Sequence, residues 1–487
     1  MVKPTDEEEY SAFGRHEKRF MVFMAAVGII SASISSHIYF PVMPTLIHDY
    51  NITPALLNLT ITSFMIIQGL APSFIGTFSD ANGRRPAYIL AFAIYFIANI
   101  GLSVQNSYGA LLALRCIQSA GSSGSASFGH AVVADIAPSS IRGKYIGPMT
   151  AGVTVTPALG PVIGGILTRY LGWRSVFWFL VIISGAFLVA YVVLMPETAR
   201  KVVGNGRVTP TAWWRQSVAQ AVSARRNPHL APRDEQPFRL TCPNPLDTLV
   251  IFREKDMFIT ILYIGIGSFT TTVLGTSTAN LFGDLYDLDS LQIGLCYLPF
   301  GIAATIGAMV TGKVLDYNYR RIAHQLNIPP EIVRSKELLD FPIERARLQI
   351  AFAPVLLLVA AFIPYGWVLQ LRLPLAVPLV LQCVVGFTST ICIGTMYTLL
   401  VDLAPAQPAT ASAAANLMRC WLGALGAGII DSMLRGMGWG WCFLFLGLVI
   451  AAASGLLALQ YVHGMKWREQ RKAREDEKQR KEAATGS

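Results

Sequence analysis

Apolar residues occur in twelve long blocks along the chain, and polar or charged segments separate these blocks. An apolar helix of about 20 residues is long enough to cross the ~30 Å hydrocarbon core of a bilayer. Helices are the expected spanning element, because an open strand in lipid leaves backbone groups without partners. The pattern predicts an all-α membrane protein with transmembrane helices at residues 20–44, 55–78, 86–105, 108–136, 146–170, 173–195, 257–281, 290–312, 348–369, 375–400, 409–434 and 439–462.

The composition agrees with this class. Of 487 residues, 53% are hydrophobic and only 14% are charged, whereas soluble domains carry about 25% charged residues. The first apolar block is longer than a signal-peptide core and no small-residue cleavage site follows it, so no cleaved signal is expected. Six of the seven cysteines lie in apolar blocks and none forms a C-x-x-C motif. The cysteines therefore predict neither a metal site nor a disulfide framework.

Lysine and arginine are distributed unevenly between the two sides of the predicted bundle. With both termini in the cytoplasm, 33 of the 39 basic residues fall in cytoplasmic segments, 4 in outer loops and 2 inside spans. Basic residues favour the cytoplasmic side, where they meet an anionic leaflet. The net charge of +10 is thus explained by the membrane surface and not by nucleic acid. The alternating charges from Lys466 to Lys481 predict a solvated helix or a disordered segment.

Two polar motifs recur along the chain. Gly-x-x-x-Asp-x-Asn-x-Arg-Arg follows span 2 at 76–85 and span 8 at 312–321, at an offset of 236. Asp-x-Ala-Pro closes span 4 at Asp135 and span 10 at Asp402, at an offset of 267. Each match pairs a span with the span six later, as in transporters made of two parallel repeats with the substrate site between them. The expected organisation is an N-terminal tail, a six-helix half, a cytoplasmic linker, a second six-helix half and a C-terminal tail, at 1–19, 20–195, 196–256, 257–462 and 463–487.

The first of these motifs resembles the cytoplasmic signature of the major facilitator superfamily. On this resemblance Gly76 allows close helix packing, and Asp80 caps a helix or pairs with a basic neighbour and so locks one conformation. The family pattern often has a basic residue directly after the aspartate, where this chain has Ala81. The charge relay of this motif is therefore expected to contain fewer charged residues. The resemblance implies a conformational gate made of Gly76, Asp80, Arg84, Arg85, Asp135, Arg142 and Asp316.

Span 5 combines small residues with prolines, which allow close helix approach and are tolerated in membranes. Their spacing resembles the antiporter motif of drug:proton antiporters, at Pro157, Gly160, Pro161, Gly164 and Gly165. Span 4 adds an Arg-x-x-Gln-x-x-Gly motif, and Pro-Glu-Thr ends span 6. Over nearly the whole chain except the tails and linker, the sequence resembles the fungal twelve-spanner drug:proton antiporters of the quinidine-resistance-like subgroup. The resemblance implies export and leaves the substrate open, because that subgroup also contains exporters of organic acids, polyamines and secondary metabolites.

Two arginines, Arg115 and Arg419, lie inside predicted spans. A guanidinium stays charged and is costly in lipid, so each must face a cavity, a partner or an anion; bonding to backbone carbonyls is the structural alternative. Helical spacing puts Gln118 and Ser122 on the face of Arg115, and Asn416 on the face of Arg419. No aspartate or glutamate lies in the middle of a span. The predicted substrate cavity therefore favours an anionic, neutral or zwitterionic compound over a cation.

His37 lies well inside span 1, and histidine is the side chain that changes charge near neutral pH. It is a candidate for proton coupling, with a structural histidine as the alternative; Asp80 and Asp431 are the other candidates. The subgroup pattern favours asparagine at this position, so a role for His37 would be particular to this chain. Asn51 and Asn58 lie in glycosylation sequons on or near the predicted outer side.

The sequence thus predicts a secondary transporter that exports a drug, toxin or secondary metabolite in exchange for protons by alternating access. An exporter of organic (poly)carboxylic acids is the alternative. The expected driving force is the proton gradient, with no cofactor or metal, and the expected form is a monomer in the plasma membrane or, alternatively, the vacuolar membrane. No motif of a serine hydrolase, zinc protease or phosphate-binding loop supports a membrane enzyme. Tails of about 19 and 25 residues are too short for a signalling domain.

Overall fold

The structure is a computed structural model, and it describes residues 10–138, 143–206, 210, 212, 214–217, 251–326, 341–404 and 408–485. Within these ranges the chain forms helices and no strand. Its contacts divide it into two compact units: unit 1 is Met1–Asn244 with Ala279–Leu298, and unit 2 is Pro245–Thr278 with Pro299–Ser487. Residues 279–298, which the sequence assigns to the second half, therefore belong to unit 1 by their contacts.

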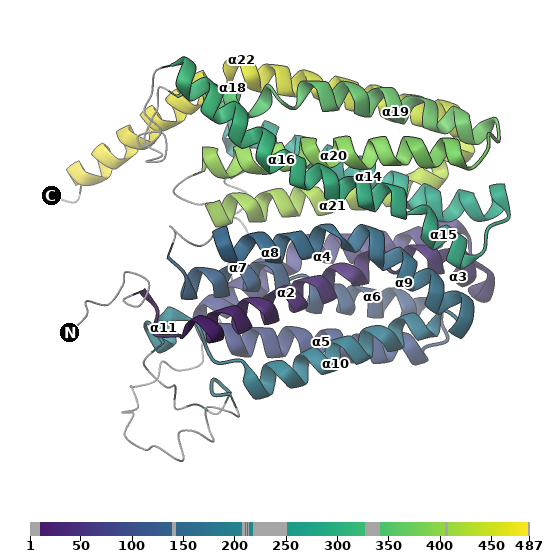
Figure 1. Cartoon of the computed structure of the whole chain (residues 1–487), viewed down its shortest axis with the longest axis horizontal. Helices are drawn as coiled ribbons and strands as arrows, with labels where there is room; N and C mark the ends of the chain where they lie inside the picture. The colour runs from purple at the N-terminus through teal and green to yellow at the C-terminus, as the bar shows by residue number, and fades with distance from the viewer. Residues whose placement is uncertain are drawn as a thin grey trace. The chain divides into compact units, whose positions relative to one another are not determined.

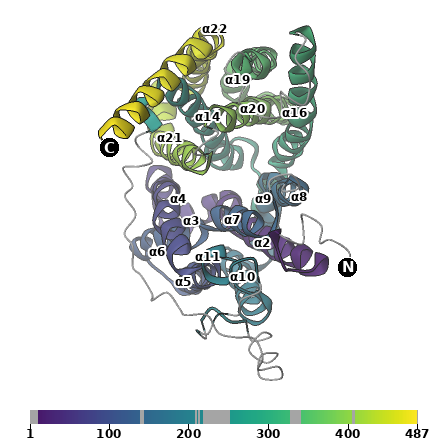
Figure 2. The ribbon, with the colours of Figure 1, turned by 90° about the vertical axis from the view of Figure 1, so that its left-hand side faces the viewer.

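Unit 1 contains the first predicted six spans in chain order. Its helices are α2 (Arg15–His37), η1 (Phe40–Val42), α3 (Met43–Tyr50), α4 (Pro54–Asn82), α5 (Arg84–Val104), α6 (Tyr108–Ser122), α7 (Ser125–Ile136), α8 (Gly143–Thr154), α9 (Thr156–Leu171), α10 (Arg174–Leu194), α11 (Arg200–Val203) and α15 (Ser290–Cys296). Seen along their axes, α2, α5, α7 and α10 lie side by side (Figure 2).

Unit 2 contains the remaining spans except for residues 279–298. Its helices are η2 (Ile251–Arg253), the larger part of α14 (Lys255–Tyr286), α16 (Leu298–Gln325), α18 (Ile343–Leu348), α19 (Phe352–Gln370), α20 (Ala376–Leu403), α21 (Pro408–Met437) and α22 (Trp439–Thr485). Helix α19 packs against both α20 and α22, and α22 continues well past the end of α19 (Figure 1). The tail after residue 466 is thus helical, and the structure selects a helix over the disordered alternative.

Ten helical stretches among the described residues are long and apolar enough to cross a membrane, and there are eleven if α8 and α9 form one span bent by 41°. The predicted span 108–136 is divided between α6 and α7, each shorter than the length of about 20 residues that spans a bilayer. The prediction of a multi-span, all-helical membrane protein is confirmed.

Prolines mark three of the breaks within predicted spans. Pro41 lies in η1, and Pro157 and Pro299 are the second residues of α9 and α16. A proline lacks the amide hydrogen that a helix interior needs and its ring crowds the preceding turn, so it is best placed in a first turn. The first predicted span therefore consists of α2, η1 and the start of α3, and each of the other two consists of two helical pieces. The apolar pattern alone does not reveal these breaks.

The two copies of the Gly-x-x-x-Asp motif fold differently. In the first copy α4 ends at Gly83, whose φ of 112° is a conformation that only glycine adopts easily, and Arg84 starts the next helix. In the second copy the residue at the same spacing is Tyr319, and α16 continues through it to Gln325. Arg320 and Arg321 consequently remain on α16 and do not begin a new helix.

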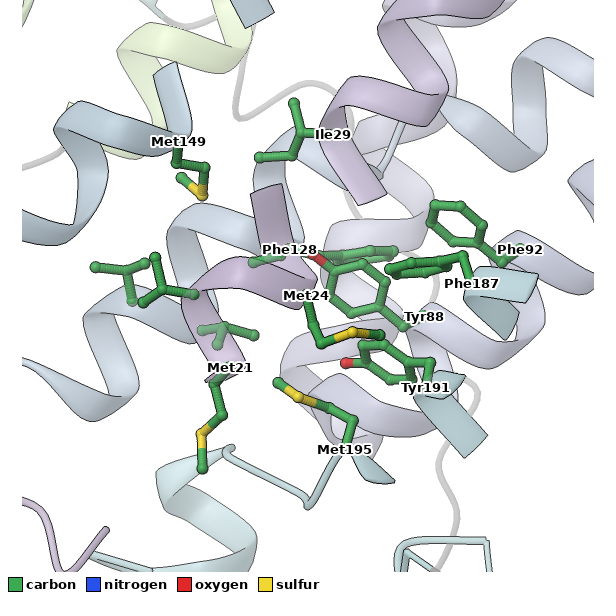
Figure 3. Packing of buried hydrophobic residues seen from close by; sticks show 14 of the residues in the cluster. Met21, Met24, Ile29, Tyr88, Phe92, Phe128, Met149, Phe187, Tyr191 and Met195 are labelled. Carbon is green, nitrogen blue, oxygen red and sulfur yellow. The ribbon is translucent and has the colours of Figure 1, made fainter. Parts of the chain in front are cut away.

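An aromatic cluster forms the core of unit 1 (Figure 3). Tyr88 on α5 has its ring centroid 4.8 Å from that of Phe128 on α7 and 4.7 Å from that of Tyr191 on α10. Phe92 and Phe187 lie 4.3 Å apart in the same cluster. Such pairs contribute about 0.5–1.5 kcal/mol each beyond burial of their area. The cluster thus ties α5, α7 and α10 together.

We predict that Gly121→Ala lowers the thermal stability of the detergent-purified protein by about 1–3 kcal/mol. A Cβ at Gly121 would lie 2.7 Å from the carbonyl oxygen of Ala91 and 2.9 Å from Cα of Tyr95. These are backbone atoms of α5, so the clash can be relieved only by moving the helix. Gly109→Ala on the same helix is the matched control, since a Cβ there meets nothing within 4 Å. Equal melting temperatures for the two variants in a fluorescence-detected unfolding assay would contradict the prediction.

Candidate functional site

A buried polar chain surrounds Arg115 in unit 1. The guanidinium of Arg115 is 1% exposed and lies between the rings of Tyr39 and Phe64, with Cζ 4.2 Å from each ring centroid. It donates a hydrogen bond to Oε1 of Gln118, one helical turn further along α6. Nε2 of Gln118 in turn donates to Oδ1 of Asn99 on α5, at 2.7 Å. The predicted placement of Gln118 on the face of Arg115 is present, and the polar chain extends through Asn99 to a second helix, α5.

The charge of Arg115 is balanced by aromatic faces and amides. Among the described residues no carboxylate lies within ion-pair distance of Arg115, and its Nε is buried without a hydrogen-bond partner. Cation–π contacts contribute about 2 kcal/mol when desolvated, which offsets only part of the cost of burying a cation. Ser122 does not join the chain, because its hydroxyl donates to the Ser119 carbonyl on its own helix.

Arg419 is the second arginine inside a predicted span, and it lies in unit 2. It is partly buried on α21, and its Nη2 donates to Oδ1 of Asn416 at 2.8 Å and approaches Sγ of Cys420 at 3.5 Å. The hydroxyl of Tyr397 on α20 is a further hydrogen-bond partner. Across the described ranges, Arg419 has no carboxylate partner either. The predicted grouping of Asn416 with Arg419 is present.

An ion-pair cluster stands at the end of unit 1 where α4, α5 and α7 meet. Arg84 bonds to Asp80 on α4 and, through Nε at 3.0 Å, to Asp135 on α7. A third bond reaches Oγ of Ser79 at 3.1 Å. One arginine thus links the predicted gate residues Asp80 and Asp135, and it ties three helices together at one point.

Three other predicted gate residues do not join this cluster. Arg85 donates instead to the carbonyls of Tyr191, Val192 and Met195 at the end of α10, which identifies it as a helix cap. The expected close packing at Gly76 is absent, because a Cβ there would meet no atom within 4 Å. Asp316 is exposed on α16 and forms no ion pair within the part of the chain that the structure describes.

In unit 2 the aspartate that corresponds to Asp135 pairs with an arginine outside the repeated motif. Nε of Arg347 on α18 lies 2.9 Å from Oδ2 of Asp402, and its Cζ lies 4.6 Å from the centroid of the Tyr319 ring. The Asp-x-Ala-Pro copies are therefore equivalent in structure, while the arginines that pair with them are not equivalent in the sequence motif. Arg142 lies outside the described residues.

Glu197 is a central residue of the unit 1 cluster that the sequence did not single out for a role. Its carboxylate is 1% exposed and accepts hydrogen bonds from the backbone amides of Arg84 and Arg85, at the start of α5, and from those of Thr198 and Ala199. Burial raises the pKa of this carboxyl, and the four amide donors lower it in part. A negative group at a helix N-terminus is stabilising. The available signal was the acidic residue directly after an apolar span.

The antiporter motif packs α9 closely against two neighbours. A Cβ at Gly160 would lie 2.8 Å from Cβ of His37, and one at Gly164 would overlap the Ile38 carbonyl at the end of α2. On the other side, a Cβ at Gly165 would lie 2.6 Å from the carbonyl oxygen of Ser290, and α15 lies alongside α9 (Figure 1). Arg169 and Asp289 add an ion pair of 3.4 Å. The predicted close approach at this motif is present, with Pro161 buried and Pro157 at the helix start.

The remaining predicted residues lie in distinct surroundings. His37 is half-buried, and its Nδ1 lies 3.0 Å from the Ser33 carbonyl. Asp431 pairs with Arg435 one turn later on α21, at 3.1 Å. Asn51 is exposed at the end of α3. Asn58 is fully buried, so this fold leaves no room for a glycan on its side-chain amide. The expectation that its sequon could be glycosylated is therefore wrong for this fold.

Comparisons with known proteins agree with this arrangement. The family model described as Major Facilitator Superfamily matches residues 25–427. The chain is 38% identical over 98% of its length to the MFS-type transporter phiD of a fungal species, covering 72% of that protein. It is 36% identical to the MFS-type transporter tstD of Talaromyces stipitatus, over 98% of this chain and 88% of the relative. It is also 36% identical to citrate exporter 1 of Aspergillus niger, over 97% and 91%.

Two solved structures share the fold. A D-xylose-proton symporter superimposes with a TM-score of 0.63 at 16% identity, over 90% of this chain and 97% of that one. The human organic anion transporter MFSD10 gives a TM-score of 0.58 at 19% identity, over 90% and 99%. At these identities the likeness concerns the fold alone.

We predict that Glu197→Gln destabilises the protein by about 1–3 kcal/mol. A glutamine can offer one carbonyl oxygen to the amides that Oε1 accepts, but its NH₂ group would face the amide of Arg85 where Oε2 now accepts. The matched control is Glu17→Gln, because Glu17 is exposed and uses only one oxygen, for the Gly14 amide. Thermal unfolding in detergent measures both, and an unchanged Glu197→Gln variant would contradict the assigned bonding.

Proposed function

Because the chain belongs to the major facilitator superfamily and is a membrane transporter, not an enzyme, we propose that it is a proton-driven exporter of a small organic compound that carries a carboxylate. The cargo class is a drug, toxin or secondary metabolite with an acidic group. Export proceeds by alternating access in exchange for protons, and the proton gradient is the only energy source required.

The observation that carries the proposal is the charge of the two arginines inside the spans. Arg115 and Arg419 are held by aromatic rings, amides and a hydroxyl, and neither is neutralised by a carboxylate among the described residues. A guanidinium that has no carboxylate partner attracts a planar anion, which it can bind with two parallel hydrogen bonds. A cationic cargo would instead be repelled by either positive charge.

A polycarboxylate is the second candidate cargo. It is favoured by the similarity over nearly the whole chain to a protein named citrate exporter 1. The two candidates share the chemistry of the bound anion and differ in its size and apolar surface.

Gating is proposed to depend on the ion pairs at the ends of the units. Charge-assisted bonds join Arg84 to Asp80 and Asp135 in unit 1, and Arg347 to Asp402 in unit 2. Such bonds stabilise the conformation in which they form, and they must break when the transporter changes state. The distribution of basic residues supports placing both termini in the cytoplasm. We place the protein in the plasma membrane as a monomer, with the vacuolar membrane as the alternative.

We predict that Arg419→Gln lowers citrate efflux from loaded vesicles at least about tenfold, because an anion partner is lost while the hydrogen bond to Asn416 can be kept. Arg345→Gln is the matched control, since Arg345 is an exposed arginine of the same unit on α18. A lipophilic acid is assayed in parallel, which separates the two cargo classes. Efflux of a permanent lipophilic cation that Arg419→Ala abolishes would contradict the anionic cargo.

His37→Asn tests the proton-coupled step. If His37 carries the coupled proton, the variant retains downhill efflux but loses the acceleration that an imposed proton gradient gives to the wild-type protein. Asparagine is close in size and keeps a donor for the Ser33 carbonyl, so the α2–α9 packing is preserved. Efflux is measured with and without the gradient, and unchanged coupling would remove His37 and leave Asp80 and Asp431 as candidates.

A further inference from the structure

Helix α22 carries three arginines on one face beyond its apolar span. Arg468, Arg471 and Arg474 follow one another at intervals of three residues, which keeps their side chains on neighbouring positions of the helix surface. Figure 1 shows this part of α22 continuing past α18 and the end of α19. Arg468 and Arg471 are only 7% and 8% exposed, so they do not behave as a solvated tail.

Each of these arginines is bound to a different part of unit 2. Arg468 donates to the Phe341 carbonyl at 2.8 Å and lies 3.5 Å from Glu344 on α18. Arg474 pairs with Glu254 at 2.9 Å, near the surface. Arg471 makes two short contacts with one amino group: 2.7 Å to the Leu403 carbonyl and 3.1 Å to Asp256 at the start of α14.

The contact with Leu403 is the informative one. Leu403 is the last residue of α20, and the terminal carbonyls of a helix have no partner inside it. A cation there satisfies the carbonyl and interacts favourably with the negative end of the helix dipole. The residue directly before Leu403 is Asp402, which holds the ion pair with Arg347. Arg471 therefore fixes the helix turn on which Asp402 stands.

Unit 1 repeats this arrangement with different residues. Nε of Arg200 donates at 3.0 Å to the carbonyl of Asp135, in the last turn of α7, while the Asp135 carboxylate pairs with Arg84. Tyr10 donates to the neighbouring Ala134 carbonyl at 3.0 Å and is itself held by Arg200. Arg200 follows the sixth predicted span, as Arg471 follows the twelfth. Two units with unlike local sequences thus place an arginine from the same point of the repeat on the end of the Asp-x-Ala-Pro helix.

We propose that Arg471 is a positioning residue that holds Asp402 within reach of Arg347 by capping α20. The C-terminal helix is then part of the gating machinery of unit 2, and Arg200 has the same task in unit 1. The proposal rests on the proposed alternating-access function for its effect on transport, and on the geometry of unit 2 alone for its effect on Asp402.

The test compares three full-length variants by hydrogen exchange in the purified protein. Arg471→Gln removes the cap, Asp256→Asn removes the ion pair but leaves the bond to Leu403, and Arg474→Gln is the exposed control. The peptides monitored are 396–404, at the end of α20, and 343–348, which is α18. Within the described part of the chain Arg471 forms no hydrogen bond or ion pair with α18, although its charge acts on Glu344 in the first turn of that helix. A change at α18 that Arg471→Gln produces and Asp256→Asn does not therefore reports on the Asp402–Arg347 pair.

Arg471→Gln is expected to accelerate exchange about tenfold at both peptides, the effect of losing one charge-assisted hydrogen bond. Asp256→Asn is expected to change the end of α20 less than Arg471→Gln does, and Arg474→Gln to change neither peptide. Faster exchange in 396–404 alone would show a cap without a positioning role and would overturn the proposal. Equal effects of Arg471→Gln and Asp256→Asn would also overturn it, since the ion pair would then be the cause.

Transport provides the second readout. Arg471→Gln is expected to lower the maximal rate of citrate efflux several-fold and to leave KM within about twofold, because Arg471 acts through Asp402 and not on cargo. An unchanged maximal rate would overturn the gating role. Wild-type protein that exports no citrate counts against the polycarboxylate cargo only, and in that case the exchange at α18 decides between the positioning role and its absence.

Discussion

An arginine that is removed from water must be satisfied by acceptors, and this requirement organises both units. Arg115 is held between two rings and an amide, Arg84 between two carboxylates, and Arg85 by the carbonyls at the end of α10. Since each arginine has partners on at least one helix other than its own, it fixes the position of those helices. Helix packing in lipid has little hydrophobic driving force of its own, so such polar contacts carry much of the specificity.

The two units reach similar ends by different local routes. Gly83 ends α4 through a left-handed turn, and Arg84 and Glu197 meet there; Tyr319 allows α16 to continue, and Arg347 on α18 then approaches Asp402 from a separate helix. The charges are exchanged as well: the acid that follows span 6 binds the start of α5, whereas the segment after span 12 supplies a base, Arg468, to Glu344. The repeat preserves the position of an ion pair more closely than the residues that make it.

The packing of α9 relates the antiporter motif to the proposed transport. Its glycines bring the α9 backbone against His37 and Ile38 on one side and against Ser290 on the other. Contacts of this kind, between backbone atoms, have no flexible side chain to absorb a change in spacing. A helix packed in this way moves between a few discrete positions and does not shift continuously. This property suits a transporter that exchanges between distinct conformations. The proposed proton acceptor His37 lies in this same contact, which would link protonation to packing.

The sequence by itself determined the class of the protein: apolar block length, the lack of charge within blocks and the two repeated motifs are local properties, and they sufficed for a multi-span helical transporter. It also pointed to Arg115 and Arg419, because charge inside a span is costly wherever it occurs, and to Asp80 and Asp135 through the repeated motifs that contain them. Only the tertiary structure decided the partners. Glu197, Arg347 and Arg471 act across 55 to 113 residues of chain, and a pairing over such separations depends on which helix ends meet and not on any local pattern. The burial of Asn58 and the open space at Gly76 were decided in the same way, by neighbours that the sequence does not name.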